Sequence, residues 1–171
     1  MGVVRIIQGD ITKLNADAIV NAANSQLLPG GGVSGSIHRA AGPELAKACQ
    51  KVAPCPPGEA RITPGFQLPA KYVIHTVGPV WQGGSQGEEK VLESAYRSSL
   101  ALAKQYGLAT VGFPSLSTGI FGYPVHLAAP VALRTLLEAA SSFETLFMVL
   151  WDDKTFQEYL QIFELLRKDF S

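Results

Sequence analysis

The sequence is poor in cysteine, contains no long apolar run and carries no excess of either charge. Cys49 and Cys55 are the only cysteines among 171 residues, and they have no metal-ligand spacing, so we expect reduced thiols rather than a disulfide framework. No apolar stretch approaches the roughly 20 residues of a membrane span. Residues 1–10 lack the apolar core and cleavage site of a signal peptide. These absences predict a cytoplasmic protein with no membrane contact.

Charge and composition disfavour two further classes. Fourteen Lys and Arg residues balance fourteen Asp and Glu residues, so we expect no electrostatic surface for nucleic acid. Clustered Asp and His ligands are missing from the sequence, which disfavours a metal-dependent phosphatase; we predict no metal and no cofactor. The hydrophobic fraction of 47% is typical of a globular chain. The length fits one domain over residues 1–171, and we expect a monomer.

Local patterns predict alternating strands and helices. Short β-branched or apolar runs predict strands over 3–7, 18–20, 60–63, 72–76, 110–113 and 146–150. Apolar residues at helical spacing predict helices over 37–41, 43–52, 88–106, 127–139 and 155–169. Glycine, proline and polar residues predict loops over 28–35, 83–87 and 115–122. The alternation favours a three-layer α/β/α sandwich with a mostly parallel sheet.

Two glycine-rich loops are candidate phosphate sites. One contains 30–33 and the other 117–122, and each lies between a predicted strand and a predicted helix. Glycine lets backbone N–H groups approach an anion, and a helix N-terminus adds partial positive charge. Neither loop matches the P-loop or the dinucleotide-binding pattern. A single such loop is more often a tight turn, but two of them favour a phosphate site. Because neither loop contains Lys or Arg, we expect backbone amides to hold a diphosphate.

Five ordered motifs point to a known family. They are GDIT at 9–12, VNAAN at 20–24, GGGVSGSIHRAAG at 30–42, HTVGPVW at 75–81 and PSLSTGIFGYP at 114–124. Together they cover nearly the whole chain, which resembles the macrodomain family and, within it, the MacroD-type branch that includes bacterial O-acetyl-ADP-ribose deacetylases. The resemblance implies a mixed, mostly parallel six-stranded sheet between helices, and a cleft for ADP-ribose or an ADP-ribosylated macromolecule.

The resemblance also implies a set of ligand-binding residues. Asp10 matches the acceptor for the adenine amino group, although it could instead cap the turn at 11–12. Trp151 matches an aromatic that stacks on adenine, unless it only packs at the rim. Phe121 matches an aromatic near the distal ribose, with a core role as its alternative. The full set is Asp10, Ile11, Asn24, Gly30, Gly31, Gly32, Val33, Ser117, Thr118, Gly119, Ile120, Phe121 and Trp151.

Catalysis is where the sequence departs from the family pattern. Asn24 matches the asparagine at the distal ribose, but Ser34 stands where enzymatic members usually carry an aspartate. A serine hydroxyl without a neighbouring base positions water but hardly takes its proton. We interpret His38 and His75 as structural, and Asn21 as a residue that ties the loop backbone together.

Two functions therefore remain open. One is a metal-independent hydrolase that removes ADP-ribose from acidic side chains or deacetylates O-acetyl-ADP-ribose, with catalysis weakened by Ser34. The other is a non-catalytic reader of ADP-ribose or of ADP-ribosylated macromolecules. A generic phosphatase ranks last, because it would need metal ligands that the sequence lacks.

Overall fold

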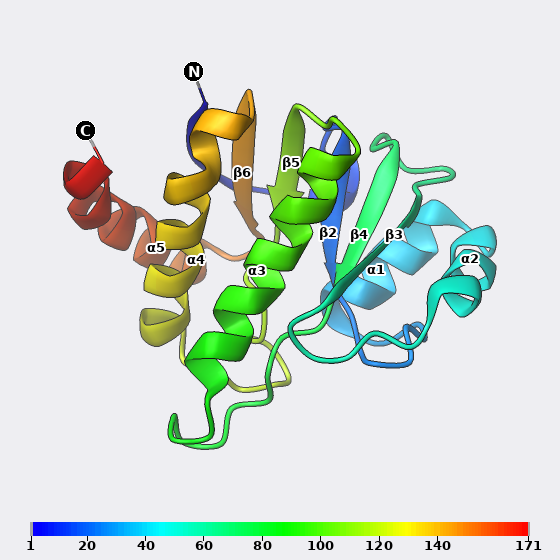
Figure 1. Cartoon of the computed structure of the whole chain (residues 1–171), viewed down its shortest axis with the longest axis horizontal. Coiled ribbons are helices and arrows are strands. Elements are labelled where there is room, and N and C mark those ends of the chain that lie inside the picture. Colours follow the sequence, from blue (N-terminus) through cyan, green and yellow to red (C-terminus); the bar gives the residue numbers. More distant parts are fainter. Residues whose placement is uncertain (1, 171) are drawn as a thin grey trace.

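The computed structural model describes residues 2–170, which form a six-stranded sheet between two layers of helices (Figure 1). The strands are β1 (Val3–Gln8), β2 (Ala18–Ala22), β3 (Ala60–Pro64), β4 (Tyr72–Thr76), β5 (Thr110–Phe113) and β6 (Thr145–Leu150). The helices are α1 (Gly32–Ala41), α2 (Glu44–Val52), α3 (Glu88–Gln105), α4 (Val125–Ala139) and α5 (Asp153–Leu166). Single 3₁₀ segments cover Ile11–Lys13, Ala140–Ser142 and Arg167–Phe170.

The strand order is β1-β6-β5-β2-β4-β3, and every neighbouring pair is parallel except β3 with β4. The sheet is thus mixed and mostly parallel, as predicted. Because the carboxyl ends of parallel strands meet at one edge, the segments after β1, β2, β4, β5 and β6 are brought together there. That edge is where the two glycine-rich loops begin.

Alternation along the central strands divides the interior into two cores. Ala18 and Val20 face the core beneath α3, α4 and α5, whereas Ile19 between them faces the core beneath α1 and α2. In the neighbouring strand, Ile74 and Val73 divide in the same way. Fully burying an aliphatic side chain of this size contributes roughly 1.5–3 kcal/mol. Burial on both faces explains why these strands read as continuous apolar runs, and it confirms the three-layer sandwich.

The start of α1 corrects a sequence prediction. The glycine content predicted a loop through residue 35, but the helix begins at Gly32, with Gly31 as its N-cap residue. The reason is close packing rather than flexibility. A Cβ on Gly35 would lie only 2.5 Å from the carbonyl oxygen of Gly30. Glycine at position 35 therefore lets the first turn of α1 pack directly on the loop that precedes it.

Other boundaries differ by only a few residues. Strand β2 runs two residues further than predicted, to Ala22, and α4 begins two residues earlier, at Val125. Helix α5 begins at Asp153 because Asp152 caps it, accepting a hydrogen bond from the Thr155 amide at 2.9 Å. Its predicted last turn is a separate 3₁₀ segment. No helix within residues 2–170 combines the length and apolarity that crossing a membrane requires.

Candidate functional site

A cleft runs along the carboxyl edge of the sheet. It consists of two cavities of about 290 and 400 Å³ that share Gly32 and Val33 at the N-terminus of α1. Segments that follow β2, β4 and β5 line the first cavity, and segments that follow β1, β5 and β6 line the second. Such crevices are where ligands bind in open α/β sheets. The cleft is therefore elongated, with a helix N-terminus and a glycine-rich loop at its middle.

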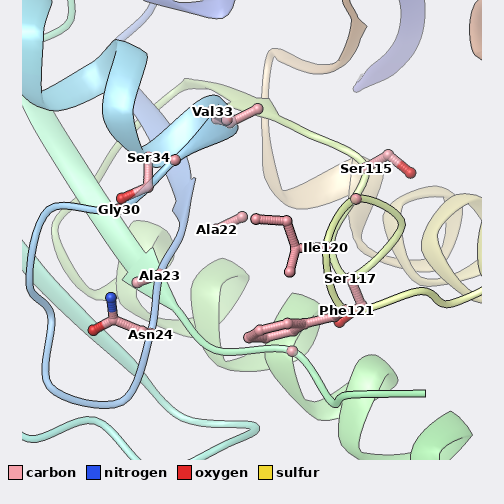
Figure 2. A pocket seen from close by; sticks show the side chains of 14 residues that line it. Ala22, Ala23, Asn24, Gly30, Val33, Ser34, Ser115, Ser117, Ile120 and Phe121 are labelled. Carbon is pink, nitrogen blue, oxygen red and sulfur yellow. The ribbon is translucent and has the colours of Figure 1, made fainter. Parts of the chain in front are cut away.

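The first cavity is lined by uncharged residues only (Figure 2). They are Ala22, Ala23, Asn24, Gly30, Gly31, Gly32, Val33, Ser34, Gly78, Ser115, Ser117, Gly119, Ile120 and Phe121. Ser34 and Ser117 are 6% and 7% exposed, and neither hydroxyl oxygen has a hydrogen-bond partner within residues 2–170. Buried polar groups are usually paired. These two hydroxyls are therefore buried without a partner in the described chain, and no side chain on this lining can act as a general base.

The first glycine-rich loop lies on one side of this cavity and the second on the other. Figure 2 shows Asn24 and Ser34 on one side, with Ser117 and Phe121 opposite them. Ile120 is 90% exposed, and its Cδ1 atom lies 4.0 Å from the position of a Cβ on Gly31. The exposed isoleucine therefore extends from the second loop towards the first at this cavity.

Ser117 is held in an unusual backbone conformation. Its φ of 67° lies in the left-handed region, which non-glycine residues rarely adopt. Its carbonyl accepts a hydrogen bond from the Tyr123 amide at 2.9 Å, and the Trp81 amide donates to Phe121 at 2.8 Å. A Cβ on Gly78 would lie 2.1 Å from the Ser117 hydroxyl. Glycine at 78 therefore allows the second loop to close against the segment that follows β4.

Two buried tyrosines anchor the second loop from below. The Tyr96 hydroxyl accepts from the Leu116 amide at 3.0 Å and donates to the Pro114 carbonyl at 3.1 Å. The Tyr159 hydroxyl lies 2.6 Å from Ser115 Oγ. Burial raises the pKa of Tyr159 to about 12, so the phenol stays protonated. These contacts tie the loop to α3 and α5, far from it in sequence.

Replacing Tyr159 with Phe should loosen this loop. Loss of one hydrogen bond between protein groups typically costs about 0.5–1.5 kcal/mol. We expect urea unfolding to show a destabilisation of that size, and the affinity for a ligand in the first cavity to fall with it. Tyr106→Phe is the matched control, because Tyr106 is 47% exposed. Equal stability and affinity in both variants would contradict an anchoring role for Tyr159.

The predicted ligand residue Thr118 does not line either cavity. Its hydroxyl donates to Ser115 Oγ at 2.8 Å and approaches the Ser115 carbonyl at 3.2 Å. Its side chain thus stabilises the loop from inside, and contact of Thr118 with a ligand stays a prediction that only its backbone amide is placed to fulfil. The alternative core role of Phe121 does not fit the structure, because Phe121 lies before α4, which begins at Val125, and is partly exposed on the lining of the first cavity.

A buried carboxylate holds the loop that precedes α3. Glu88 is 3% exposed and accepts hydrogen bonds from the amides of Gln82, Gly84 and Gln86 at 2.9, 2.9 and 2.7 Å. Burial alone would raise the pKa of Glu88, but these backbone donors outweigh it and lower the pKa to about 2. Trp81 at the start of this loop is the residue whose amide binds Phe121.

Glu88→Gln should therefore lower Tm by several degrees at pH 7. A depressed pKa means that ionised Glu88 stabilises the fold above its ordinary pKa of 4.5, and that this stabilisation is lost as the pH falls towards 2. The Tm difference between wild type and the variant should shrink over that range in a thermal scan series. Glu89→Gln, at an exposed neighbour, is the control. A difference that does not change with pH would contradict this role.

The second cavity combines a carboxylate, a cation and an indole. Its lining consists of Gly9, Asp10, Ile11, Gly32, Val33, Ser36, Arg39, Pro114, Val149 and Trp151. Asp10 Oδ1 accepts from the amide and hydroxyl of Thr12 at 3.0 and 2.7 Å, so the capping role is real. Asp10 Oδ2 has no hydrogen bond within the described chain and remains an acceptor for a ligand. Trp151 is 73% exposed, as a stacking platform would be.

Asn24 has a structural task beside its place in the first cavity. Its amide nitrogen donates to the Leu28 carbonyl at 2.9 Å, and its amide oxygen accepts from the Leu28 amide at 3.0 Å. The amide keeps a second N–H and a second lone pair for a ligand. Asn24 thus shapes the loop that leads to Gly30 and presents a neutral donor and acceptor to the cavity.

His75 takes no part in the cleft. It is fully buried, with Nδ1 accepting from Asn21 at 3.0 Å and Nε2 2.9 Å from the Thr63 hydroxyl. Burial lowers the pKa of His75 to about 3, and burial raises the pKa of the adjacent Cys49 thiol to about 11. Both groups are therefore neutral at pH 7. Asn21 binds this histidine rather than the loop backbone, which corrects its predicted contact.

Nearly all predicted site residues line the cleft, and several others join them. The additional lining residues are Ala22, Ala23, Gly78, Ser115, Gly9, Ser36, Arg39, Pro114 and Val149. Most of them lie at or just beyond a strand end, a signal that the sequence already contained. Ser36 and Arg39 lie on the same side of α1 as Gly32. Their helical spacing from Gly32 could not be recognised in the sequence, because residues 28–35 were predicted to form a loop. No group of three His, Cys, Asp or Glu side chains within residues 2–170 could hold a metal ion.

Comparison with known proteins agrees with this architecture. The model of the Macro domain family matches residues 20–132. A macro domain-containing protein of Lactiplantibacillus plantarum is 55% identical over 156 residues, covering 89% of this chain and 91% of the relative. An O-acetyl-ADP-ribose deacetylase of Citrobacter rodentium is 48% identical over 166 residues, covering 93% and 94%. A structure of an Oceanobacillus iheyensis macrodomain variant with ADPR superimposes with a TM-score of 0.91 at 43% identity, covering 95% and 92%. The chain belongs to the macro domain family, which confirms the resemblance in its motifs.

Proposed function

We propose that this chain binds ADP-ribose in the cleft and slowly hydrolyses ADP-ribosyl esters there, on acidic side chains or as O-acetyl-ADP-ribose. One observation carries the proposal: the two cavities share Gly32 and Val33 at the N-terminus of α1. A nucleoside diphosphate sugar such as ADP-ribose has the same order of groups, with a nucleoside on one side of a diphosphate and a second ribose on the other. The adenine would lie between Asp10 and Trp151, and the diphosphate on the amides of Gly32 and Val33.

The distal ribose would then occupy the first cavity. Asn24 would supply a neutral donor and acceptor for its hydroxyl groups, and Ser34 and Ser117 lie on the same lining with hydroxyls that have no partner in the described chain. Phe121 covers one side of the cavity. An ester on this ribose would be reached by a water that Ser34 orients. A ligand phosphate would accept the proton of this water, because no ionisable side chain lines the cavity. The released products are ADP-ribose and a carboxylic acid.

The absence of an ionisable side chain from the lining of the first cavity favours a second function, that of a non-catalytic reader. Loss of a general base costs about 10²–10⁴-fold in rate. With a hydrolysis rate lowered by that factor, ADP-ribosylated macromolecules would dissociate before they are cleaved. The deacetylase from Citrobacter rodentium supports the hydrolase, whereas the uncharged lining supports the reader.

Two measurements on one preparation test both functions. Calorimetry with ADP-ribose measures binding, and release of ADP-ribose from a glutamate-linked mono-ADP-ribosylated protein and from O-acetyl-ADP-ribose measures hydrolysis. We expect binding together with slow release above the uncatalysed rate. Binding without release would favour the reader. Absence of binding would overturn both functions.

A further inference from the structure

One wall of the second cavity carries a cation that the diphosphate site does not require. Gly32, Ser36 and Arg39 follow one another along the same side of α1 at helical spacing. Arg39 Nη2 donates to Ser36 Oγ at 3.3 Å. No carboxylate within residues 2–170 forms an ion pair with Arg39, although ion pairs occur elsewhere in this part of the chain. The guanidinium is exposed and lines the cavity.

The charges in this cavity are separated. Asp10 is the only other ionisable residue on its lining, and its Oδ1 is bound to Thr12 rather than to Arg39. Asp10 lies just beyond the end of β1, whereas Arg39 lies on the wall formed by α1. The cavity therefore offers an acceptor for a neutral base at one place and an uncompensated cation at another.

The position of Arg39 along the cleft indicates which part of a bound ligand would lie beside the guanidinium. Ser36 lies four residues beyond Gly32, a rise of about 6 Å along the helix axis. If the diphosphate binds at Gly32 and the base at Asp10, the group beside Ser36 and Arg39 is the ribose of the adenosine. An unmodified ribose presents only hydroxyl groups there. A guanidinium fork matches a phosphate far better, because it donates two parallel charge-assisted hydrogen bonds.

We propose that Ser36 and Arg39 form a subsite for a phosphate monoester on the adenosine ribose, so that the chain binds 2′-phospho-ADP-ribose more tightly than ADP-ribose. The inference rests on the proposed binding of ADP-ribose in this cleft. The same chemistry serves dinucleotide-binding proteins, in which an arginine near the ribose accommodates a 2′-phosphate. The Ser36 hydroxyl adds a donor to the phosphate and positions the guanidinium.

Calorimetry with ADP-ribose and 2′-phospho-ADP-ribose tests this subsite. Hydrogen bonds to charged groups contribute enough for the wild type to prefer the phosphorylated ligand by about tenfold. Arg39→Met should abolish that preference, because it should weaken the binding of 2′-phospho-ADP-ribose about tenfold more than the binding of ADP-ribose. The variant should stay folded, since an exposed substitution rarely perturbs the fold. Ser36→Ala should reduce the preference. Lys51→Met, which removes an exposed cation from α2, should keep it.

Three results would overturn the subsite while leaving ADP-ribose binding intact. The first is equal or weaker binding of the phosphorylated ligand by wild type. The second is a preference that persists in Arg39→Met. The third is an equal loss of affinity for both ligands in Arg39→Met, which would place the guanidinium on the diphosphate. If neither ligand binds wild type, the proposed function fails together with the subsite.

Discussion

Ser34→Asp is expected to raise the rate of ADP-ribosyl ester hydrolysis by about 10²–10⁴-fold, the usual contribution of a general base. Ser34 is 6% exposed and faces a cavity without any ionisable side chain. Burial there would raise the pKa of an aspartate towards the working pH, while the N-terminus of α1 would keep it ionised. Both effects suit a carboxylate that takes a proton from water.

Release of ADP-ribose from O-acetyl-ADP-ribose, measured as kcat and KM against pH, is the test. We expect kcat to increase with little change in KM, and a rising limb in the pH profile that wild type lacks. Ser34→Asn is the matched control, because an amide has the same size but cannot accept the proton. If the asparagine variant is as fast as the aspartate variant, geometry rather than basicity limits the wild-type rate.

Trp151→Ala is expected to weaken ADP-ribose binding by about 5- to 150-fold, which corresponds to the roughly 1–3 kcal/mol of a base stacked on an aromatic side chain. Trp151 is 73% exposed and lies beside Asp10 in the second cavity. Because so little of the indole is buried by the protein itself, the substitution should leave Tm nearly unchanged. The loss would therefore be specific to the ligand.

Calorimetry and fluorescence both measure this effect. The chain has two tryptophans, and Trp81 packs on Tyr123 with ring centroids 4.6 Å apart. Quenching of tryptophan emission on binding should therefore come from Trp151 and vanish in the alanine variant. Trp151→Phe should retain most of the affinity, since it keeps an aromatic face. An unchanged Kd in a folded Trp151→Ala protein would place the adenine elsewhere.

Local pattern alone determined much of this protein. The apolar runs predicted all six strands, and the loops at their carboxyl ends contain most of the cleft. These features are readable because periodicity and glycine content act over a few residues. The family is also evident in the sequence through its ordered motifs.

The tertiary structure alone decided which residues meet. Strand β1 pairs with β6, with Gln8 opposite Leu150, and this register brings Asp10 beside Trp151. The anchoring of Ser115 by Tyr159 depends on α5 packing beneath the second loop. Arg39 reaches the cleft only because Gly35 lets α1 begin early against Gly30. Contacts between distant segments are set by sheet order and close packing, and no local sequence pattern encodes either.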